Sequence, residues 1–176
     1  TLFRSVKAPT AVTSNPKDPV NTTSDLADKW YLVFGSGPTD RTKATTANNV
    51  SAKLYIYDLA QSSAGGFVTG FAPKELEPVP ASPTVPGNFT GDPVTVDWDL
   101  DFKADALYVG TSGGTSAAPK GKLFKLRLDK NLGLATDDRS PGQWQGPFVL
   151  TDAGNPILST PTVTFDEQGN RWVFSG

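Results

Sequence analysis

Residues 93–110 read Pro-Val-Thr-Val-Asp-Trp-Asp-Leu-Asp-Phe-Lys-Ala-Asp-Ala-Leu-Tyr-Val-Gly, and this stretch decides the predicted fold. A Pro-led run of branched residues (93–96) comes first, an acidic segment (97–105) follows, and an apolar run (106–110) ends at glycine. Branched and aromatic residues bounded by proline and glycine are typical of short β-strands. The stretch therefore predicts two strands joined by an acidic loop.

The acidic loop carries four aspartates at relative positions 1, 3, 5 and 9: Asp97, Asp99, Asp101 and Asp105. Such a concentration of like charge is unfavourable unless a cation or water separates the carboxylates. Calcium takes about six to eight oxygen ligands in flexible geometry, whereas magnesium prefers few carboxylates and keeps its waters. We therefore predict a Ca²⁺ site formed by these four carboxylates and the backbone carbonyl of Lys103 at position 7.

Two other interpretations of the loop compete with this one. An EF-hand is disfavoured because Phe102 replaces the glycine of position 6 and Tyr108 replaces the glutamate of position 12. An amphipathic strand is the second alternative, since acids and apolar residues alternate from residue 97 to residue 102. The strand interpretation does not explain the presence of Asp105, whereas the calcium loop uses it as a ligand, so we favour the calcium loop.

Composition narrows the function classes. The chain has 176 residues, which suits one domain, and a net charge of −2 from 16 basic and 18 acidic residues. The basic residues are scattered, so we expect neither a nucleic-acid nor an anionic-membrane partner. Cysteine, histidine and methionine are absent. This excludes the usual zinc, haem and iron–sulfur sites, Ser-His and Cys-His nucleophile pairs, and disulfides. No apolar run reaches membrane-spanning length.

Similar strands recur along the chain in the same order. Each set is expected to begin with a Pro-led strand, at 9–13, 93–96 and 161–165, followed by an aromatic strand that runs into Gly or Ser, at 30–37, 107–113 and 172–176. The first two sets continue with a third strand, at 53–59 and 122–128, and an outer strand, at 66–68 and 147–150. A separate leading strand is expected at 2–6, and residues 71–93 are interpreted as a Pro-rich loop insertion. Recurring sets of four strands are typical of propeller blades.

The predicted fold class is therefore all-β, a partial β-propeller of four-stranded antiparallel blades. Residues 9–71 are expected to form one blade, 93–150 a second blade with the calcium loop, and 161–176 the start of a third. Propellers need about four to eight blades to close. The chain is therefore expected to be a fragment, completed by the remaining blades of the same propeller or by another chain. The alternative, a β-sandwich, gives no reason for the strand types to return in the same order.

Residues 91–110 and 121–126, with the aromatic strands at 30–37 and 171–176, resemble the C-terminal β-propeller of PilY-type type IV pilus proteins. The resemblance covers most of the chain and is most specific from residue 91 to residue 126. In that family a D-x-D-x-[DN]-x-x-x-D loop binds calcium, and Asp97, Asp99, Asp101 and Asp105 match its carboxylate positions. Phe102 departs from the more frequent glycine.

The resemblance implies a non-enzymatic protein at the tip of a type IV pilus, in the periplasm or on the surface of a Gram-negative bacterium. Its implied role is to support pilus assembly, to control retraction and twitching, and to contribute to adhesion, with pilus subunits as partners. Two alternatives stay open. One is a fragment of a quinoprotein dehydrogenase propeller, although its four tryptophans follow no fixed motif. The other is an integrin-like calcium-binding adhesion propeller, although only one blade carries an acidic loop.

Overall fold

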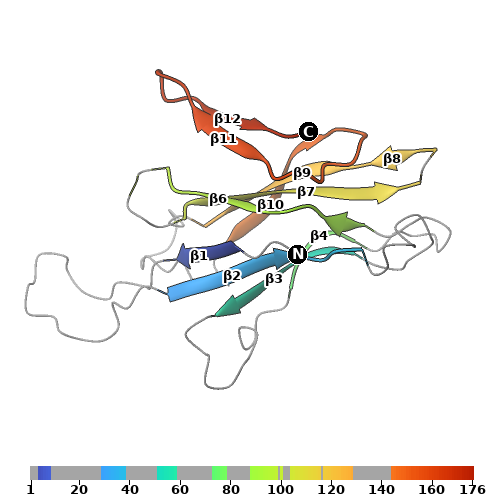
Figure 1. The fold of residues 1–176 in the computed structure, drawn as a ribbon, viewed down its shortest axis with the longest axis horizontal. Helices are drawn as coiled ribbons and strands as arrows, with labels where there is room; N and C mark the ends of the chain where they lie inside the picture. The colour runs from blue at the N-terminus through green and yellow to red at the C-terminus, as the bar shows by residue number, and fades with distance from the viewer. Residues whose placement is uncertain are drawn as a thin grey trace, which may run out of the picture.

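The computed structural model describes residues 4–8, 29–38, 51–58, 73–78, 88–98, 100, 104–115, 117–128 and 144–176. These residues form antiparallel β-sheets without a helix, so the predicted all-β class is confirmed. Figure 1 shows the sheets as layers, with β1–β4 at the bottom and β11–β12 at the top. Over these ranges there is no apolar helix of the length needed to traverse a lipid bilayer.

The first sheet contains β1 (Arg4–Ala8), β2 (Lys29–Gly35), β3 (Ala52–Asp58) and β4 (Lys74–Glu77). Each strand pairs antiparallel with the next in sequence, so the sheet is a simple meander. Alternate residues of β2, Tyr31 and Val33, are buried in the core. Their neighbours Leu32 and Phe34 are half-buried on the opposite face, as the two-residue period of a strand requires.

The second sheet is built around β7 (Ala106–Gly114), which is buried over almost its whole length. The other strands are β5 (Phe89–Thr90), β6 (Val94–Val96), β8 (Pro119–Lys120), β9 (Lys122–Arg127) and β10 (Gln145–Asp152). β5 and β6 pair with one edge of β7, β8 and β9 pair with its other edge, and β10 pairs with β9. The sheet therefore has four antiparallel positions, like the first sheet.

The third sheet is the hairpin of β11 (Thr162–Phe165) and β12 (Arg171–Phe174). Its turn is organised by Asp166, whose Oδ1 accepts the backbone N–H of Gln168 at 3.0 Å and of Asn170 at 2.8 Å. Gly169 has a φ of 80°, a conformation that glycine adopts readily. Residues 166–170 therefore form the hairpin turn of the third sheet.

Two apolar cores join the three layers. Between the first and second sheets lie Tyr31, Val33, Ala52, Leu54, Ile56, Leu76, Ala104, Leu107, Val109, Phe124, Leu126, Leu128 and Trp144. Between the second and third sheets lie Val94, Ala106 and Tyr108, with Val96, Trp98, Val163 and Val173 packed against them. The second sheet is therefore covered on both faces, which explains why β7 lacks the alternating burial of a half-exposed strand.

Where the chain crosses from the second sheet to the third, it passes close to three glycines of the second sheet. The linker after β10 passes over Gly91, Gly110 and Gly121, where an added Cβ would lie 2.6, 2.2 and 2.2 Å from backbone oxygens of the linker. The linker is fixed there by the Ile157 N–H, which donates to Thr111 O at 2.9 Å. The same bond recurs at the first sheet, where the Thr90 N–H donates to Ser36 O at 2.9 Å.

Several predicted strand positions are corrected by the structure. The strand expected to stand alone at 2–6 overlaps β1, which pairs with β2 and so belongs to the first sheet. The fourth strand of that sheet is β4, which with β5 lies inside the tract interpreted as a loop insertion. No strand was expected between residues 113 and 122, but β7 extends to Gly114 and Pro119–Lys120 form β8. The strands expected at 9–13 and 66–68 lie outside the described residues.

Candidate metal site

The predicted calcium loop connects two strands that pair with each other. β6 and β7 are antiparallel, with Val94 opposite Tyr108, Thr95 opposite Leu107 and Val96 opposite Ala106. The next residue on each strand is an aspartate, so Asp97 and Asp105 both lie at the base of the loop. β6 ends at Val96, so Asp97 and Trp98 lie beyond the strand, contrary to the amphipathic-strand alternative.

Asp105 connects the two ends of the loop through hydrogen bonds. Its side chain is buried at 7 % exposure, and its Oδ2 accepts the backbone N–H of Trp98 at 2.6 Å. Its own N–H donates to Val96 O at 2.8 Å, and its carbonyl accepts the N–H of Leu128 at 2.7 Å. The first two of these bonds join Asp105 to residues 96–98, so they hold the two ends of the loop together.

Trp98 and Arg171 connect the loop to the third sheet. The guanidinium carbon of Arg171 lies 4.6 Å from the centre of the Trp98 ring, within the range of a cation–π contact. The indole Nε1 of Trp98 is buried and has no hydrogen-bond partner in the described part of the chain. Arg171 also lies near Tyr108, whose pKa is raised by burial and lowered, to a smaller extent, by the Arg171 charge.

The backbone of the loop bends at Leu100. This residue has a φ of 60°, in the left-handed region, and its side chain is 71 % exposed. Left-handed geometry disfavours a residue with a Cβ by roughly 1–2 kcal/mol. The left-handed residue thus lies at position 4 of the loop, whereas an EF-hand has its glycine, which allows the sharp turn, at position 6. Packing of the side chain does not compensate for this strain, because Leu100 is largely in solvent.

Only part of the predicted ligand set can be placed. Asp97 and Asp105 are described, and they lie at the two ends of the loop. Asp99, Asp101 and Lys103 lie outside the described residues, so their part in the ligand set stays a prediction. Among the described residues alone, no group of three or more Asp, Glu, His or Cys side chains is placed to hold a metal. Two carboxylates brought to one loop base fit the oxygen chemistry that calcium prefers.

The hairpin of the third sheet provides an internal comparison. Its Asp166 directly follows β11, the strand that pairs with β12, just as Asp97 directly follows β6, the strand that pairs with β7. The connecting turn of the third sheet, however, has only five residues, 166–170. Asp166 Oδ2 accepts the Asn170 Nδ2–H at 2.8 Å and the Trp172 Nε1–H at 3.0 Å, in addition to the two backbone bonds of the turn. These bonds, that of Asn170 first and that of Trp172 next, lower the pKa of Asp166. In the short turn, protein N–H groups satisfy the carboxylate.

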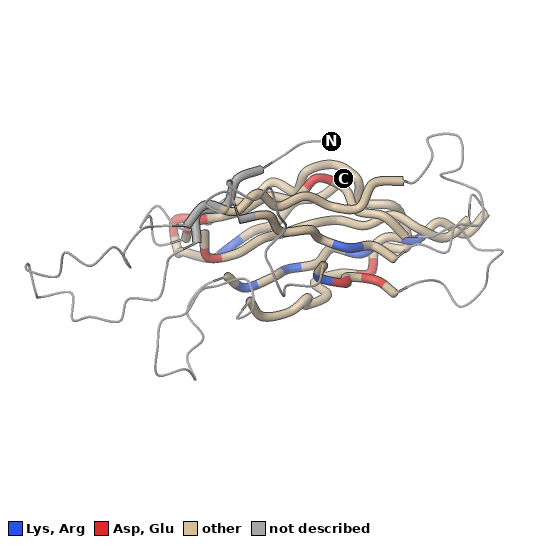
Figure 2. Tube along the Cα trace, turned by 90° about the horizontal axis from the view of Figure 1, so that it is seen from below, with Lys and Arg blue, Asp and Glu red and all other residues tan. Residues whose placement is uncertain are grey.

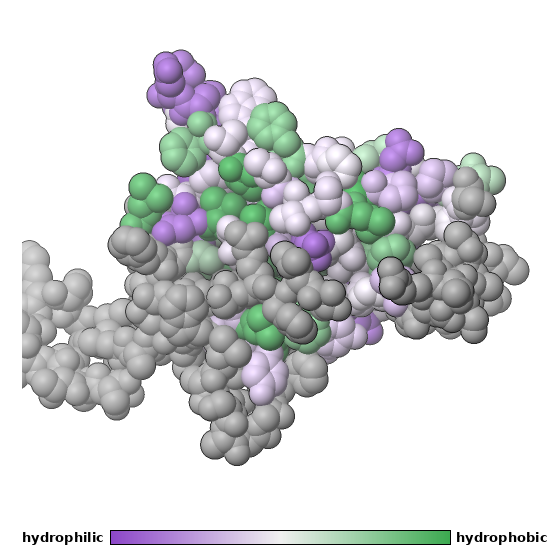
Figure 3. Space-filling view, viewed as in Figure 1, coloured by the Kyte–Doolittle hydropathy of each residue, from purple (hydrophilic) through white to green (hydrophobic). Residues whose placement is uncertain are grey.

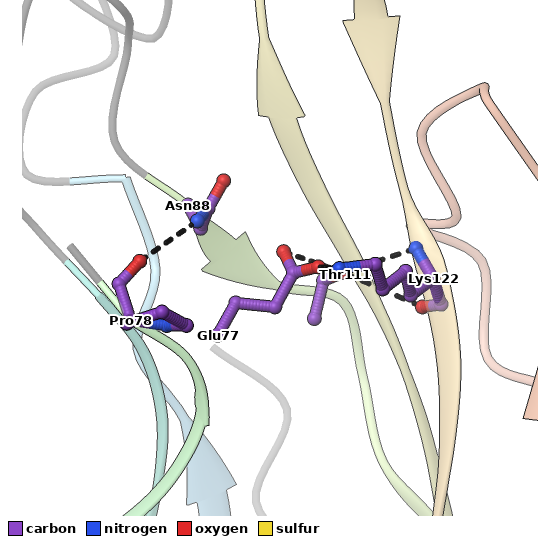
Figure 4. A network of polar contacts seen from close by, with 5 residues as sticks. All are labelled: Glu77, Pro78, Asn88, Thr111 and Lys122. Atoms are coloured by element: carbon purple, nitrogen blue, oxygen red, sulfur yellow. Dashed lines mark hydrogen bonds and ion pairs between the residues drawn. The ribbon is translucent and has the colours of Figure 1, made fainter. Parts of the chain in front are cut away.

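A second polar cluster, not expected from the sequence, lies between the first and second sheets. Figure 4 shows Glu77 of β4 reaching toward Thr111 of β7 and Lys122 of β9. Its Oε1 lies 2.9 Å from Lys122 Nζ, and its Oε2 accepts the Thr111 hydroxyl at 3.3 Å. The hydrogen bond with Glu77 raises the pKa of Lys122. Glu77 and Thr111 are buried, so the cluster places polar contacts between the two sheets beside their apolar core.

The described Lys and Arg residues are spread along several strands (Figure 2).

The chain matches no family model, no curated protein and no solved structure. The resemblance to the PilY-type propeller therefore stays a prediction from residues 91–126 and the aromatic strands.

Proposed function

We propose that this chain is a non-enzymatic, calcium-binding segment of a β-propeller. In this proposal the loop from Asp97 to Asp105 binds one Ca²⁺ ion through Asp97, Asp99, Asp101, Asp105 and the Lys103 carbonyl. The observation that carries the proposal is the closed base of the loop, where Asp105 Oδ2 accepts the Trp98 N–H at 2.6 Å. This bond and the pairing of β6 with β7 hold the first and last acidic positions together before any ion binds.

Support for propeller blades comes from a bonding pattern that the first two sheets share. In the first sheet the Ser36 hydroxyl accepts the N–H of Lys53, at 2.9 Å, and in the second sheet the Thr111 hydroxyl accepts the N–H of Lys122, at 3.1 Å. Both residues follow a glycine, and their carbonyls accept an N–H from the chain on its way into the next sheet, from Thr90 of β5 in the first case and from Ile157 of the linker in the second. Two four-position sheets with the same crossing geometry, stacked face to face, are what successive blades require.

Calcium would act on the hairpin of β6 and β7. The ion supplies positive charge to a loop whose carboxylates otherwise repel one another, and the ligands must be ionised to bind it. Because an ion that binds only the folded loop stabilises the fold by mass action, its binding free energy adds to the free energy of unfolding. The short turn of the third sheet, where N–H groups satisfy Asp166, needs no ion.

The biological setting rests on the resemblance to PilY-type proteins. We propose that the segment acts at the tip of a type IV pilus, on the cell surface or in the periplasm, where it supports pilus assembly, retraction control and adhesion. Pilus subunits and the remaining propeller blades are the proposed partners. The absence of histidine and cysteine from the sequence agrees with a protein that binds rather than catalyses.

Thermal unfolding with and without calcium tests the proposal. The melting temperature of the wild-type chain is expected to rise with Ca²⁺ and to fall again with chelator, following the mass-action relation for a ligand of the folded state. Asp97→Asn and Asp101→Asn are expected to remove this response, since each deletes a charged ligand. An unchanged melting temperature of the wild-type chain in calcium and in chelator would refute the calcium site.

Asp166→Asn is the matched control, because Asp166 occupies the equivalent position in the short turn. This variant is expected to lose stability equally with and without calcium and to keep the full calcium response. A loss of the calcium response in Asp166→Asn would place the ion elsewhere. Titration with Mg²⁺ under the same conditions is expected to give a smaller rise, because magnesium keeps its waters and uses few carboxylates.

A further inference from the structure

Trp98 places part of the acidic loop in the apolar core between the second and third sheets. Of the residues that form this core in the described structure, Trp98 alone belongs to the loop, since the others come from β6, β7, β11 and β12. In Figure 3 the polar tip of the β11–β12 hairpin projects at the top, and apolar side chains lie below it, toward the second sheet. The loop therefore forms part of the surface on which the hairpin packs.

Arg171 reaches the same ring from the hairpin. It is the first residue of β12 and shares a face of that strand with Val173, which packs against this core. Its guanidinium carbon lies 4.6 Å from the centre of the Trp98 ring. Within the described residues, no hydrogen bond holds the buried Nε1–H of Trp98. Packing and the Arg171 contact therefore orient the ring in this part of the chain.

The backbone of Trp98 lies between two predicted calcium ligands. Asp97 precedes it and Asp99 follows it, and its own N–H donates to Asp105 Oδ2 at 2.6 Å. An ion bound by the flanking carboxylates would restrict the backbone on both sides of Trp98 and, with it, the positions that the ring can take. The occupied loop would then present the ring to Arg171 at a smaller entropic cost than the empty loop.

We propose that Arg171 is a positioning residue of the calcium site, and that calcium binding to the loop strengthens the docking of the β11–β12 hairpin on the second sheet. This inference rests on the proposed calcium binding. Because such coupling is reciprocal, the hairpin contact raises the calcium affinity of the loop by the same factor. The strength of a single cation–π contact limits that factor to roughly two- to fivefold.

The charge of Arg171 by itself predicts the opposite effect. A guanidinium near the loop repels a calcium ion, so its removal would raise the calcium affinity if this repulsion decided the outcome. However, four aspartates outweigh the combined charge of Lys103 and one Ca²⁺ ion, so the occupied loop as a whole still attracts a cation. We therefore expect the orientation of the Trp98 ring to decide the outcome, and removal of Arg171 to lower the affinity.

Calorimetric titration with Ca²⁺ tests this sign. Arg171→Gln is expected to bind calcium roughly two- to fivefold more weakly than the wild type, the range that one cation–π contact allows. Arg171→Lys keeps the charge without the planar group that stacks on an indole, and its affinity is expected to lie between the two. Lys125→Gln is the matched control, because Lys125 Nζ lies 5.7 Å from the centre of the Tyr108 ring, in the same core but outside the loop. It is expected to keep the wild-type affinity.

Hydrogen exchange of the hairpin amides measures the reciprocal effect. In the wild type these amides are expected to exchange roughly two- to fivefold more slowly in saturating Ca²⁺ than in chelator, and in Arg171→Gln this difference is expected to disappear. The melting temperature of each variant shows that it is folded. An unchanged or raised affinity in Arg171→Gln, or an equal loss in Lys125→Gln, overturns the inference.

The same measurements separate this inference from the proposed function. A wild-type chain that binds no Ca²⁺ in the calorimeter refutes both. A wild-type chain that binds Ca²⁺ while its hairpin amides exchange at the same rate in calcium and in chelator overturns the inference alone and leaves the calcium site standing.

Discussion

At the scale of single residues, the acidic loop contains one residue, Leu100, in an unfavourable backbone conformation. Leu100 adopts a φ of 60° while its side chain remains mostly in solvent. Glycine adopts this geometry without the Cβ clash that disfavours other residues. The position of Leu100 between the predicted ligands Asp99 and Asp101 suggests that the bend serves the path of the loop rather than the core.

Replacement of Leu100 by glycine is expected to increase the free energy of unfolding by about 1 kcal/mol, because strain is relieved and little buried surface is lost. Urea denaturation measures this change. Leu158→Gly is the control, since Leu158 is also exposed but has no positive φ. The control is expected to be neutral or destabilising, and a destabilised Leu100→Gly would contradict the assignment of strain.

Asp166 predicts a specific pH dependence at the third sheet. Its pKa is lowered from 3.8 in the folded state, first by Asn170 and then by Trp172. A carboxyl with a lowered folded-state pKa stabilises the fold above its unfolded pKa, and this contribution disappears as pH falls through the folded-state value. The indole N–H resonance of Trp172 is expected to titrate with a midpoint below 3.8. A midpoint at or above that value would show that the bond does not persist in solution.

At the scale of elements, strand glycines determine where the chain passes between sheets. Gly110 of β7 lies under the linker, and a Cβ there would be 2.2 Å from Ile157 O and 2.4 Å from Ile157 Cγ2. The backbone of Ile157 cannot move aside for an added Cβ as the end of a flexible side chain could. The crossing therefore requires glycine at this position for close approach of two backbones, not for a turn.

Gly110→Ala is expected to reduce the free energy of unfolding by about 1–3 kcal/mol, the usual effect of overpacking a close contact. Denaturant unfolding measures the loss, and hydrogen exchange of the Ile157 amide is expected to accelerate as its bond to Thr111 weakens. Gly37→Ala is the control, because no atom of the described residues lies within 4 Å of a Cβ at that position. Equal stabilities of the two variants would contradict the crossing geometry.

Strand patterns predicted some elements well and missed others for physical reasons. Residues 93–96, 147–150 and 161–165 carry branched or aromatic runs after proline, and β6, β10 and β11 form there. β4 was missed because Lys74-Glu75-Leu76-Glu77 has one apolar residue and lies in a Pro-rich tract. Its stability depends on Lys122, a partner far along the chain. Local propensity contains no signal for such a contact.

At the scale of the molecule, apolar cores join the described layers, and a partly buried ion pair also joins the first sheet to the second. The Glu77–Lys122 contact is 2.9 Å long, and the side chain of Glu77 is 10 % exposed while that of Lys122 is 35 % exposed. Removal of one partner from a buried polar network leaves the others without their bonds. The directional bonds of this cluster therefore help to determine the orientation of the first sheet relative to the second, because apolar contacts are not directional.

Glu77→Ala is expected to lower the free energy of unfolding by about 1–3 kcal/mol at neutral pH. Since the pKa of Lys122 is raised above 10.5 when folded, the stabilisation is complete below the unfolded value and is lost as pH rises through the folded value. The difference between wild type and Glu77→Ala is thus expected to shrink in alkaline solution. A difference that stays constant with pH would show that the pair contributes through packing.

The all-β class, the two inner strands of the first sheet and most strands of the second and third sheets were predictable from strand patterns, whereas the outer strands of the first sheet were not. The acidic site was predictable only in outline. The spacing of the four aspartates placed them in one loop, and the pairing of β6 with β7 agrees with that placement. The closing bond from Trp98 to Asp105 and the bend at Leu100 were not predictable, because backbone geometry decides them.

Terbium luminescence tests the calcium loop most directly, because Trp98 lies inside the loop and can sensitise a bound lanthanide ion. Terbium resembles calcium as a hard cation with oxygen ligands. We predict sensitised emission from the wild-type chain that saturates at one ion per chain, is displaced by Ca²⁺, and is lost in Trp98→Phe and in Asp101→Asn. Emission that is absent from the wild-type chain, or that survives both substitutions, would contradict calcium binding by this loop.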